Sequence, residues 1–250
     1  MDDFMRLKGK TAIVTGGASG FGAGIARKFA AEGAQVMVAD LNFEVAHEIA
    51  TEIGGIAQLC DVSNSGSVLE MRDSVLNAFG HLDILVNNAG VTHLPLELED
   101  VTMADFEKVY NVNIKSVYLT AQAFVPHFKV RSSGVILNVA STGGVSPRPR
   151  LTWYNSSKGW MITATKGMAV ELAPSGIRVN AINPVAGETP LLKSFMGEDT
   201  PEVRAKFLST IPIGRFSTPE DMGNAACFLC SDEASMITGI AVEVDGGRCI

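Results

Sequence analysis

Residues 11–22 read TAIVTGGASGFG, a short run rich in β-branched residues followed at once by a glycine-rich turn. The run at 11–15 predicts a strand, and the residues from Gly20 onward predict a helix. Glycine lets the backbone turn sharply and come close to a pyrophosphate, whose charge is met by the helix N-terminus. The spacing here is G-x-x-x-G-x-G, and such a turn by itself is weak evidence for a nucleotide site.

The alternation of strand and helix continues from this turn to the end of the chain. Strands are predicted at Thr11–Thr15, Gln35–Ala39, Ile56–Cys60, Ile84–Val86, Val135–Val139, Arg178–Ile182 and Ala241–Val244. Helices are predicted at Gly20–Glu32, Phe43–Ile53, Ser65–Phe79, Met103–Phe128, Thr152–Leu172 and Pro219–Leu229. Several strands are apolar on both faces, as in a parallel sheet covered by helices on each side. The pattern predicts an α/β doubly wound fold, and with no linker or repeat it predicts one domain over 1–250.

Composition narrows the class of protein and its partners. Hydrophobic residues make up 46% of the 250 residues and charged residues 19%, which is typical of a globular protein. The formal net charge is −7 and no basic run occurs, so we expect no nucleic-acid partner. Apolar stretches fall short of the roughly 20 residues of a membrane span. The N-terminal residues lack the apolar core of a signal peptide, so we expect a cytoplasmic protein.

The four cysteines predict neither a disulfide framework nor a metal site. They are Cys60, Cys227, Cys230 and Cys249, too few and too scattered for a stapled fold. Cys227 and Cys230 form a C-x-x-C, but no second pair or histidine cluster completes a tetrahedral site. We expect both to be buried in a helix, and we expect no metal.

Tyr154 and Lys158 lie four residues apart, and Ser141 precedes the tyrosine by 13 residues. Four helical residues turn through about 400°, so phenol and ammonium share one helix face. An ammonium beside a phenol favours the phenolate, so a group with an ordinary pKa near ~10 is predicted to exchange a proton closer to neutrality. The Ser141 hydroxyl is suited to hold a carbonyl oxygen. These three residues are candidate catalytic groups.

Asp40 ends the second predicted strand, 20 residues past Gly20. An acidic side chain at this place accepts hydrogen bonds from an adenosine ribose in dinucleotide-binding folds. The alternative is that Asp40 only opens the turn at residues 40–42.

Several motifs now stand in order along the chain. They are Thr15-Gly-x-x-x-Gly-x-Gly22, Asn87-Asn88-Ala89-Gly90, Asn113, Ser141 and Tyr154-x-x-x-Lys158. Over essentially its whole length the chain resembles a short-chain dehydrogenase/reductase of the compact, roughly 250-residue subfamily. The resemblance implies a Rossmann-type domain with a seven-stranded parallel sheet and hydride transfer between NAD(H) and a secondary alcohol or ketone.

The resemblance also implies a role for each matching residue. Tyr154 is the general acid in reduction and the base in oxidation, Lys158 lowers its pKa and holds the nicotinamide ribose, and Ser141 polarises the substrate oxygen. Asn113 kinks its helix and anchors a water that relays protons to Lys158. The expected cofactor contacts are Gly16, Ser19, Gly20, Phe21, Gly22, Asp40, Leu41, Asp61, Val62, Asn88, Ala89, Gly90, Tyr154, Lys158, Pro184, Gly187 and Thr189.

One segment departs from the family pattern. After the sixth strand the family usually reads Asn-Pro-Gly or Cys-Pro-Gly, whereas here Val185 takes the place of the glycine and Gly187 comes two residues later. Thr189 keeps its expected place five residues after Pro184, where the family binds the nicotinamide carboxamide. The sequence leaves the backbone path of this loop open.

The expected cofactor is NAD. The 2′-phosphate of NADP would meet the carboxylate of Asp40, and two anions in a partly desolvated pocket repel each other. Relatives that prefer NADP commonly carry Arg or Lys at the positions that Ser19 and Leu41 occupy here.

The substrate is less constrained by the sequence. Residues 190–212 carry apolar side chains at helix-like spacing, which indicates either an apolar lid over the substrate or ordinary packing. Arg148, Arg150, Leu151 and Trp153 precede the catalytic tyrosine and are candidates for the pocket border, as is His93.

Two alternative functions and an assembly state complete the expectations. An NADP-dependent 3-oxoacyl reductase is disfavoured by Asp40. A catalytically silent nucleotide-sensing protein is disfavoured by the complete set of Asn113, Ser141, Tyr154 and Lys158. Apolar residues on more than one face of the helices at Met103–Phe128 and Thr152–Leu172 indicate a homotetramer.

Overall fold

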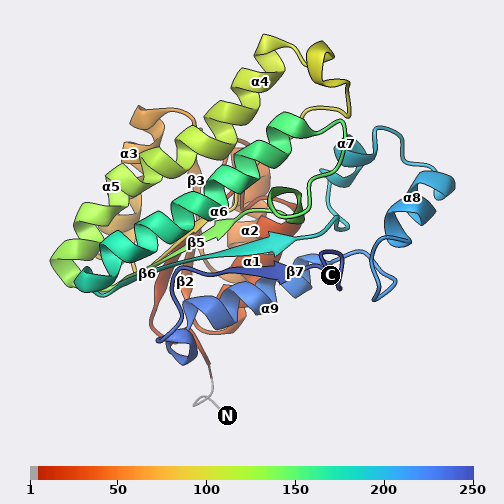
Figure 1. Ribbon diagram of the computed structural model, residues 1–250. Helices are drawn as coiled ribbons and strands as arrows, with labels where there is room; N and C mark the ends of the chain where they lie inside the picture. Colours follow the sequence, from red (N-terminus) through yellow and green to blue (C-terminus); the bar gives the residue numbers. More distant parts are fainter. Residues whose placement is uncertain (1–4) are drawn as a thin grey trace.

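A seven-stranded parallel sheet forms the centre of the computed structural model, which describes residues 5–250 (Figure 1). The strands are β1 (Thr11–Thr15), β2 (Gln35–Asp40), β3 (Ile56–Leu59), β4 (Ile84–Asn87), β5 (Gly134–Val139), β6 (Ile177–Pro184) and β7 (Ala241–Val244). Their order across the sheet is β3-β2-β1-β4-β5-β6-β7, and every neighbouring pair is parallel. The predicted doubly wound sheet is confirmed, with strand ends within two residues of those expected.

Helices cover both faces of the sheet (Figure 1). They are α1 (Gly20–Ala31), α2 (Phe43–Ile53), α3 (Ser65–Phe79), α4 (Met103–Tyr110), α5 (Ser116–Arg131), α6 (Thr152–Leu172), α7 (Leu192–Met196), α8 (Pro201–Leu208) and α9 (Pro219–Cys230). α1, α2 and α9 pack on one face, and α3, α5 and α6 pack on the other. No helix within residues 5–250 combines the length and apolar character that a membrane span requires.

Successive residues of the central strand enter two different cores. Val14 of β1 packs in the same buried cluster as Phe29 of α1, whereas Ile13 belongs to the cluster of Phe124 on α5. Because side chains alternate across a strand, a strand covered on both faces must be apolar at consecutive positions. This requirement explains why β1 reads as an unbroken run rather than as an alternating pattern.

The carboxyl ends of β1 and β4 meet at the middle of the sheet. From β1 the chain moves outward to β2 and β3, and then returns to place β4 on the other side of β1. At such a reversal the loops that follow the two strands diverge and leave a crevice between them. The glycine turn follows β1 and the motif Asn88–Gly90 follows β4, so both predicted cofactor motifs border this crevice.

The helix predicted at Met103–Phe128 is present and runs from Met103 to Arg131, but it is not α-helical throughout. A π-helical turn, η3 (Asn111–Lys115), separates α4 from α5. An inserted π turn widens the helix by one residue and is frequent at functional sites. Here it carries Asn113, whose side chain is fully buried.

Helix ends follow the local sequence signals. Thr218 Oγ1 accepts the Asp221 N–H, and the Asp221 carboxylate accepts the Thr218 N–H, which completes a capping box at the start of α9. Gly80 ends α3 in the left-handed region at φ 78°. Residues 190–212 contain the two short helices α7 and α8, which stand apart from the helices that cover the sheet (Figure 1).

Candidate active site

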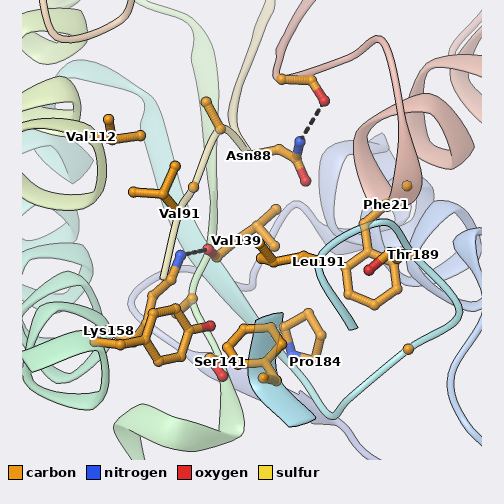
Figure 2. Close-up of a pocket in the computed structure, with 18 of the residues that line it drawn as sticks. Phe21, Asn88, Val91, Val112, Val139, Ser141, Lys158, Pro184, Thr189 and Leu191 are labelled. Carbon is orange, nitrogen blue, oxygen red and sulfur yellow. Dashed lines mark hydrogen bonds between the residues drawn. The ribbon is translucent and has the colours of Figure 1, made fainter. Parts of the chain in front are cut away.

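A cavity of about 470 Å³ lies at the carboxyl edge of the sheet (Figure 2). It extends from the glycine turn after β1, past the ends of β2 and β4, to α6 and the segment at 190–207. Every residue expected to contact the cofactor lines this cavity except Gly22, and Ser141 lines it as well. Asn113 does not line it and lies behind its wall.

Asn88 fixes the shape of the glycine turn. Its Nδ2 donates to the carbonyl oxygens of Thr15 and Gly16, at 2.9 and 3.0 Å, and Figure 2 draws one bond from this side chain. Thr15 Oγ1 accepts the backbone N–H groups of Asn88 and Ala89 in return. Sequence reasoning missed this role of Thr15, because a threonine at a strand end carries no signal of its own. A Cβ at Gly22 would lie 2.1 Å from the Gly16 oxygen, so Gly22 supports the turn from behind without touching the cavity.

Asp40 turns its carboxylate toward the same glycine turn. One oxygen accepts the Ala18 N–H at 3.1 Å and the other accepts the Asn42 N–H at 3.0 Å. The carboxylate thus ties the end of β2 to the turn after β1 and still borders the cavity. The sequence left two roles open for Asp40, a contact with the cofactor or the opening of a local turn. In the structure its carboxylate accepts the N–H of Asn42 in that turn and also borders the cavity.

Asp61 and Val62 form the wall after β3. Asp61 Oδ1 accepts both the N–H and the hydroxyl of Ser63, at 2.9 and 2.7 Å. The Asp61 N–H donates to Ser67 at the start of α3, and Val62 is buried. These bonds hold the loop against α3 and fix its place at the cavity edge.

Tyr154 and Lys158 share one face of α6, as their spacing predicts. Lys158 Nζ lies 5.9 Å from the centre of the Tyr154 ring and donates to the Val139 carbonyl at 2.8 Å (Figure 2). Both side chains are buried, Lys158 to 4% exposure. No carboxylate among residues 5–250 forms an ion pair with this ammonium.

Burial sets the proton affinities of this pair. It raises the pKa of the Tyr154 phenol to about 12, and a side-chain hydrogen bond with Ser141 opposes the rise only in part. Burial also lowers the pKa of the Lys158 ammonium to about 8. The expected lowering of the phenol pKa by Lys158 is not found, because burial of the phenolate is the largest influence on Tyr154 and it raises the pKa. Tyr154 holds its proton at neutral pH.

Ser141 stands directly after β5, where the backbone leaves the sheet. Its side chain accepts the Gly143 N–H at 3.0 Å and caps the 3₁₀ turn η4 (Thr142–Gly144). The same hydroxyl lies close enough to Tyr154 to lower the pKa of its phenol, although burial outweighs this effect. Two elements thus deliver two hydroxyl groups to one point of the cavity.

Asn113 locks the loop after β4 from the π turn. Its Oδ1 accepts the Val91 N–H at 2.9 Å, and its Nδ2 donates to the Val91 carbonyl at 2.9 Å and to Ser157 Oγ at 3.0 Å. A Cβ at Gly90 would lie 3.4 Å from Lys158 Nζ and 3.6 Å from Asn113 Oδ1. Gly90 therefore leaves a narrow space between the lysine and the asparagine.

The structure defines the loop whose path the sequence left open. β6 continues through Pro184, and Val185 turns into a small apolar cluster with Leu192, Met196, Ile211 and Phe216. Gly187 then bridges to Ser217, and a Cβ there would lie 2.4 Å from the Phe21 ring. Thr189 lies over the glycine turn, 3.1 Å from where a Cβ of Gly20 would stand.

The segment at 190–212 contributes both to packing and to the cavity. Leu192 and Met196 pack in the apolar cluster of Val185, whereas Leu191, Phe195 and Phe207 line the cavity. Phe195 meets the Tyr154 ring edge-on, with ring centroids 5.0 Å apart. Phe207 also packs against the apolar cluster of Val185, so packing and cavity lining overlap within this segment.

Of the residues proposed to border the pocket ahead of Tyr154, two line it. Arg148 and Leu151 face the cavity. Arg150 forms an exposed ion pair with Glu97, and Trp153 packs against Phe106. Sequence reasoning missed Asn155, which lines the cavity and donates to the Arg148 carbonyl at 2.7 Å.

The remaining candidates lie away from the cavity. His93 is buried, with Nδ1 2.7 Å from the Leu94 carbonyl oxygen, and is absent from the cavity wall. Cys227 and Cys230 pack in the core beneath α9. Within residues 5–250 no group of three or more His, Cys, Asp or Glu side chains is arranged to hold a metal ion.

Comparison with known proteins gives the family. The family model described as enoyl-(acyl carrier protein) reductase matches residues 16–248. The 4-formylbenzenesulfonate dehydrogenase of Comamonas testosteroni is 52% identical over 98% of this chain and 100% of that protein. The chain belongs to the short-chain dehydrogenase/reductase family, and it is an oxidoreductase that acts on CH–OH groups.

Two solved structures share the fold and are similar in sequence. One is a 3-ketoacyl-(acyl-carrier-protein) reductase from Brucella melitensis complexed with NADH, with TM-score 0.94 and 48% identity, covering 98% of this chain and 100% of that one. The other is a 7α-hydroxysteroid dehydrogenase complexed with NADH and 7-oxo glycochenodeoxycholic acid, with TM-score 0.92 and 38% identity, covering 99% and 97%.

The burial of Lys158 leads to a prediction for stability. Because folding lowers the ammonium pKa from 10.5 to about 8, protonation opposes folding below pH 8, and this penalty fades as the pH rises toward 10.5. Lys158→Met has similar length and no charge, so we expect its Tm at pH 7 to equal or exceed that of the parent, although turnover is lost. The advantage should shrink between pH 8 and pH 10.5, as measured by thermal unfolding.

The control is Lys206→Met, which removes an exposed ammonium from α8 and should show no such pH dependence. A Tm for Lys158→Met far below the parent at pH 7 would show that the ammonium stabilises the fold through its bond to Val139.

Proposed function

We propose that the protein transfers a hydride between NAD(H) and a secondary alcohol or its ketone, with Tyr154 as general acid and base. One observation carries the proposal. The Tyr154 hydroxyl, Lys158 and Ser141 converge on the same cavity as the glycine turn. A site for proton exchange and a cradle for a dinucleotide therefore open into one space, as hydride transfer requires.

The residues of the cavity fit a dinucleotide. The turn at Gly16–Gly22 brings backbone N–H groups to the N-terminus of α1, which suits a pyrophosphate. Asp40 and Asp61 stand beyond it for an adenosine, and Lys158 and Thr189 lie toward the Tyr154 end. The nicotinamide of the bound cofactor would accept or supply the hydride. We propose that the residues expected to contact the cofactor do so, with the exception of Gly22. Gly22 and Asn113 do not line the cavity, and they support its wall from behind.

The proton chemistry follows from the burial of Tyr154. Ser141 holds the substrate oxygen beside the phenol, and the phenol donates its proton to the alkoxide as the ketone is reduced. A phenol with a pKa raised to about 12 is protonated at neutral pH, which suits the donor role. Oxidation needs the phenolate, so its rate should rise with pH. Lys158 donates to the Val139 carbonyl and would also hold a ribose hydroxyl of the bound cofactor, and Asn113 keeps the Val91 loop in place behind it.

The choice of NAD rests on the charge around Asp40. Its carboxylate borders the cavity with Leu41 beside it, 67% exposed and uncharged. A 2′-phosphate at this place would face the carboxylate without a cation in contact. The two structures described above contain NADH, which supports the same choice.

The substrate class within alcohols and ketones has two candidates. Leu191, Phe195 and Phe207 give the Tyr154 end an apolar wall, which suits the cyclic and aromatic compounds named for the 4-formylbenzenesulfonate and 7α-hydroxysteroid relatives. The second candidate, a 3-oxoacyl thioester, is supported by the similarity to the 3-ketoacyl reductase. We further propose that residues 1–250 act as one domain, that 190–212 forms its substrate lid, and that the protein is cytoplasmic.

The cofactor preference is measured with a panel of secondary alcohols and ketones and both cofactors, from absorbance at the nicotinamide band. We expect a higher kcat/KM with NAD(H). Asp40→Ser combined with Leu41→Arg should shift the preference toward NADP(H), because a cation then replaces the anion. Leu41→Arg alone, which keeps the carboxylate, should shift it less. A parent that prefers NADP(H) would refute the role of Asp40.

We also propose a homotetramer. Exposed apolar side chains on α4, α5 and α6 include Met103, Phe106, Tyr118, Trp160 and Val170, which association would bury. Light scattering at micromolar concentration should give about four times the 26.5 kDa of one chain. A mass near one chain would contradict this.

A further inference from the structure

Arg148 places a positive charge in the wall of the cavity at the Tyr154 end. It precedes α6 and faces the cavity together with Leu151 and Phe207. Its guanidinium lies 4.4 Å from the centre of the Phe207 ring, and Nη2 donates to Thr210 Oγ1 at 3.1 Å. That bond uses one of five N–H donors, so the fork retains donors for a further acceptor.

The backbone of Arg148 is fixed relative to the proposed acid. Asn155 Nδ2 donates to the Arg148 carbonyl at 2.7 Å, and Asn155 directly follows Tyr154 on α6. Phe207 and Thr210 contact the guanidinium itself. The backbone and the guanidinium of Arg148 are thus both held in place, and such pre-organisation suits a ligand contact.

This cation has no counterion in the part of the chain that the structure describes. No carboxylate within residues 5–250 lies within ion-pair distance of Arg148, whereas Arg204 pairs with Asp199 and Arg215 pairs with Asp221. The carboxylates in the cavity wall, Asp40 and Asp61, follow β2 and β3 on the far side of the sheet from β5 and α6.

A second unpaired guanidinium lies nearby. Arg248 donates from Nη1 to Ser146 Oγ at 3.1 Å, and its buried Nε has no acceptor within residues 5–250. Burial, and then the positive charge of Arg248, lower the pKa of Arg148. The two guanidinium groups are close enough to repel each other, and neither forms an ion pair with a carboxylate within residues 5–250.

We propose that the substrate carries an anionic group, a carboxylate or a sulfonate, on an apolar body, and that Arg148 binds this group. This inference rests on the proposed function, since it assigns the substrate class of the same site. A guanidinium fork binds a carboxylate or sulfonate through two N–H donors, and the surrounding apolar wall strengthens the attraction by excluding water. Phe195 and Leu191 contact the apolar body between the anion and Tyr154.

The competing interpretation is structural. The contacts of Arg148 with Phe207 and Thr210 also tie the segment at 190–212 to the start of α6. Loss of such a tie would harm every substrate alike, whereas loss of an anion contact harms only the charged ones. The two interpretations therefore differ in a ratio of rates and not in a single rate.

The test compares 4-acetylbenzoate with its methyl ester, two ketones of similar shape that differ in charge, using NADH. 4-Acetylbenzenesulfonate serves as a second anion. We expect kcat/KM for the anions to exceed that for the ester, and Arg148→Met to reduce this ratio by about 10- to 100-fold, as for a lost charged hydrogen bond. Arg148→Lys keeps the charge without the fork and should retain part of the preference.

Arg150→Met is the matched control, because it removes an exposed arginine two residues away that faces Glu97 and not the cavity. It should leave the ratio unchanged. Two results would overturn the inference. One is a parent whose kcat/KM for the anions does not exceed that for the ester, which is measured without any variant. The other is an equal loss of kcat/KM for the anions and the ester in Arg148→Met.

Failure of the proposed function is recognised separately by calorimetric titration of the parent with 4-methylbenzoate, an unreactive anion, against 4-methylbenzamide. Tighter binding of the anion that is lost in Arg148→Met supports the anion site even if no ketone is reduced. Turnover of ketones without selective anion binding or anion preference leaves the hydride-transfer proposal intact and refutes the role of Arg148.

Discussion

The reversal of strand order between β1 and β4 is the constraint on which the site depends. Because all seven strands are parallel, the loops that follow them emerge at one edge of the sheet. The reversal separates the loops after β1 and β4, and the bonds from Asn88 to Thr15 and Gly16 then hold the two sides at a fixed spacing. The cavity, the glycine turn and the hydroxyl groups of Ser141 and Tyr154 all stand at this edge.

Burial rather than pairing determines the chemistry at the other end of the cavity. Lys158 and Tyr154 are both removed from water, and each is pushed toward its neutral form. A buried ammonium without a carboxylate costs stability, and the fold tolerates it because Val139 accepts one of its hydrogen bonds. The Lys158 ammonium therefore lowers the stability of the fold at the place where function requires its charge.

The sequence predicted the sheet and most helix ends, and nearly all of the residues expected to contact the cofactor line the cavity, because these follow from periodicity, capping residues and motif spacing. The family resemblance implied a kink at Asn113, but the apolar pattern did not predict the π turn found there, since an insertion of one residue leaves that pattern intact. The sequence also gave the wrong direction for the Tyr154 pKa, because burial depends on contacts such as Phe195 that are distant in sequence. The sequence also could not show which side chains of 190–212 pack together and which line the cavity, because this depends on where Val185 lies in the structure.

The central claim is that the buried Tyr154 hydroxyl delivers the proton while neighbouring residues hold the cofactor. Tyr154→Phe tests it most directly, because the ring keeps its packing against Phe195 and only the hydroxyl is lost. NADH affinity from fluorescence titration should remain nearly unchanged, and the steady-state rate of ketone reduction should fall by at least about 10²–10⁴-fold. A variant that binds NADH and still reduces the ketone at the parental rate would contradict the account.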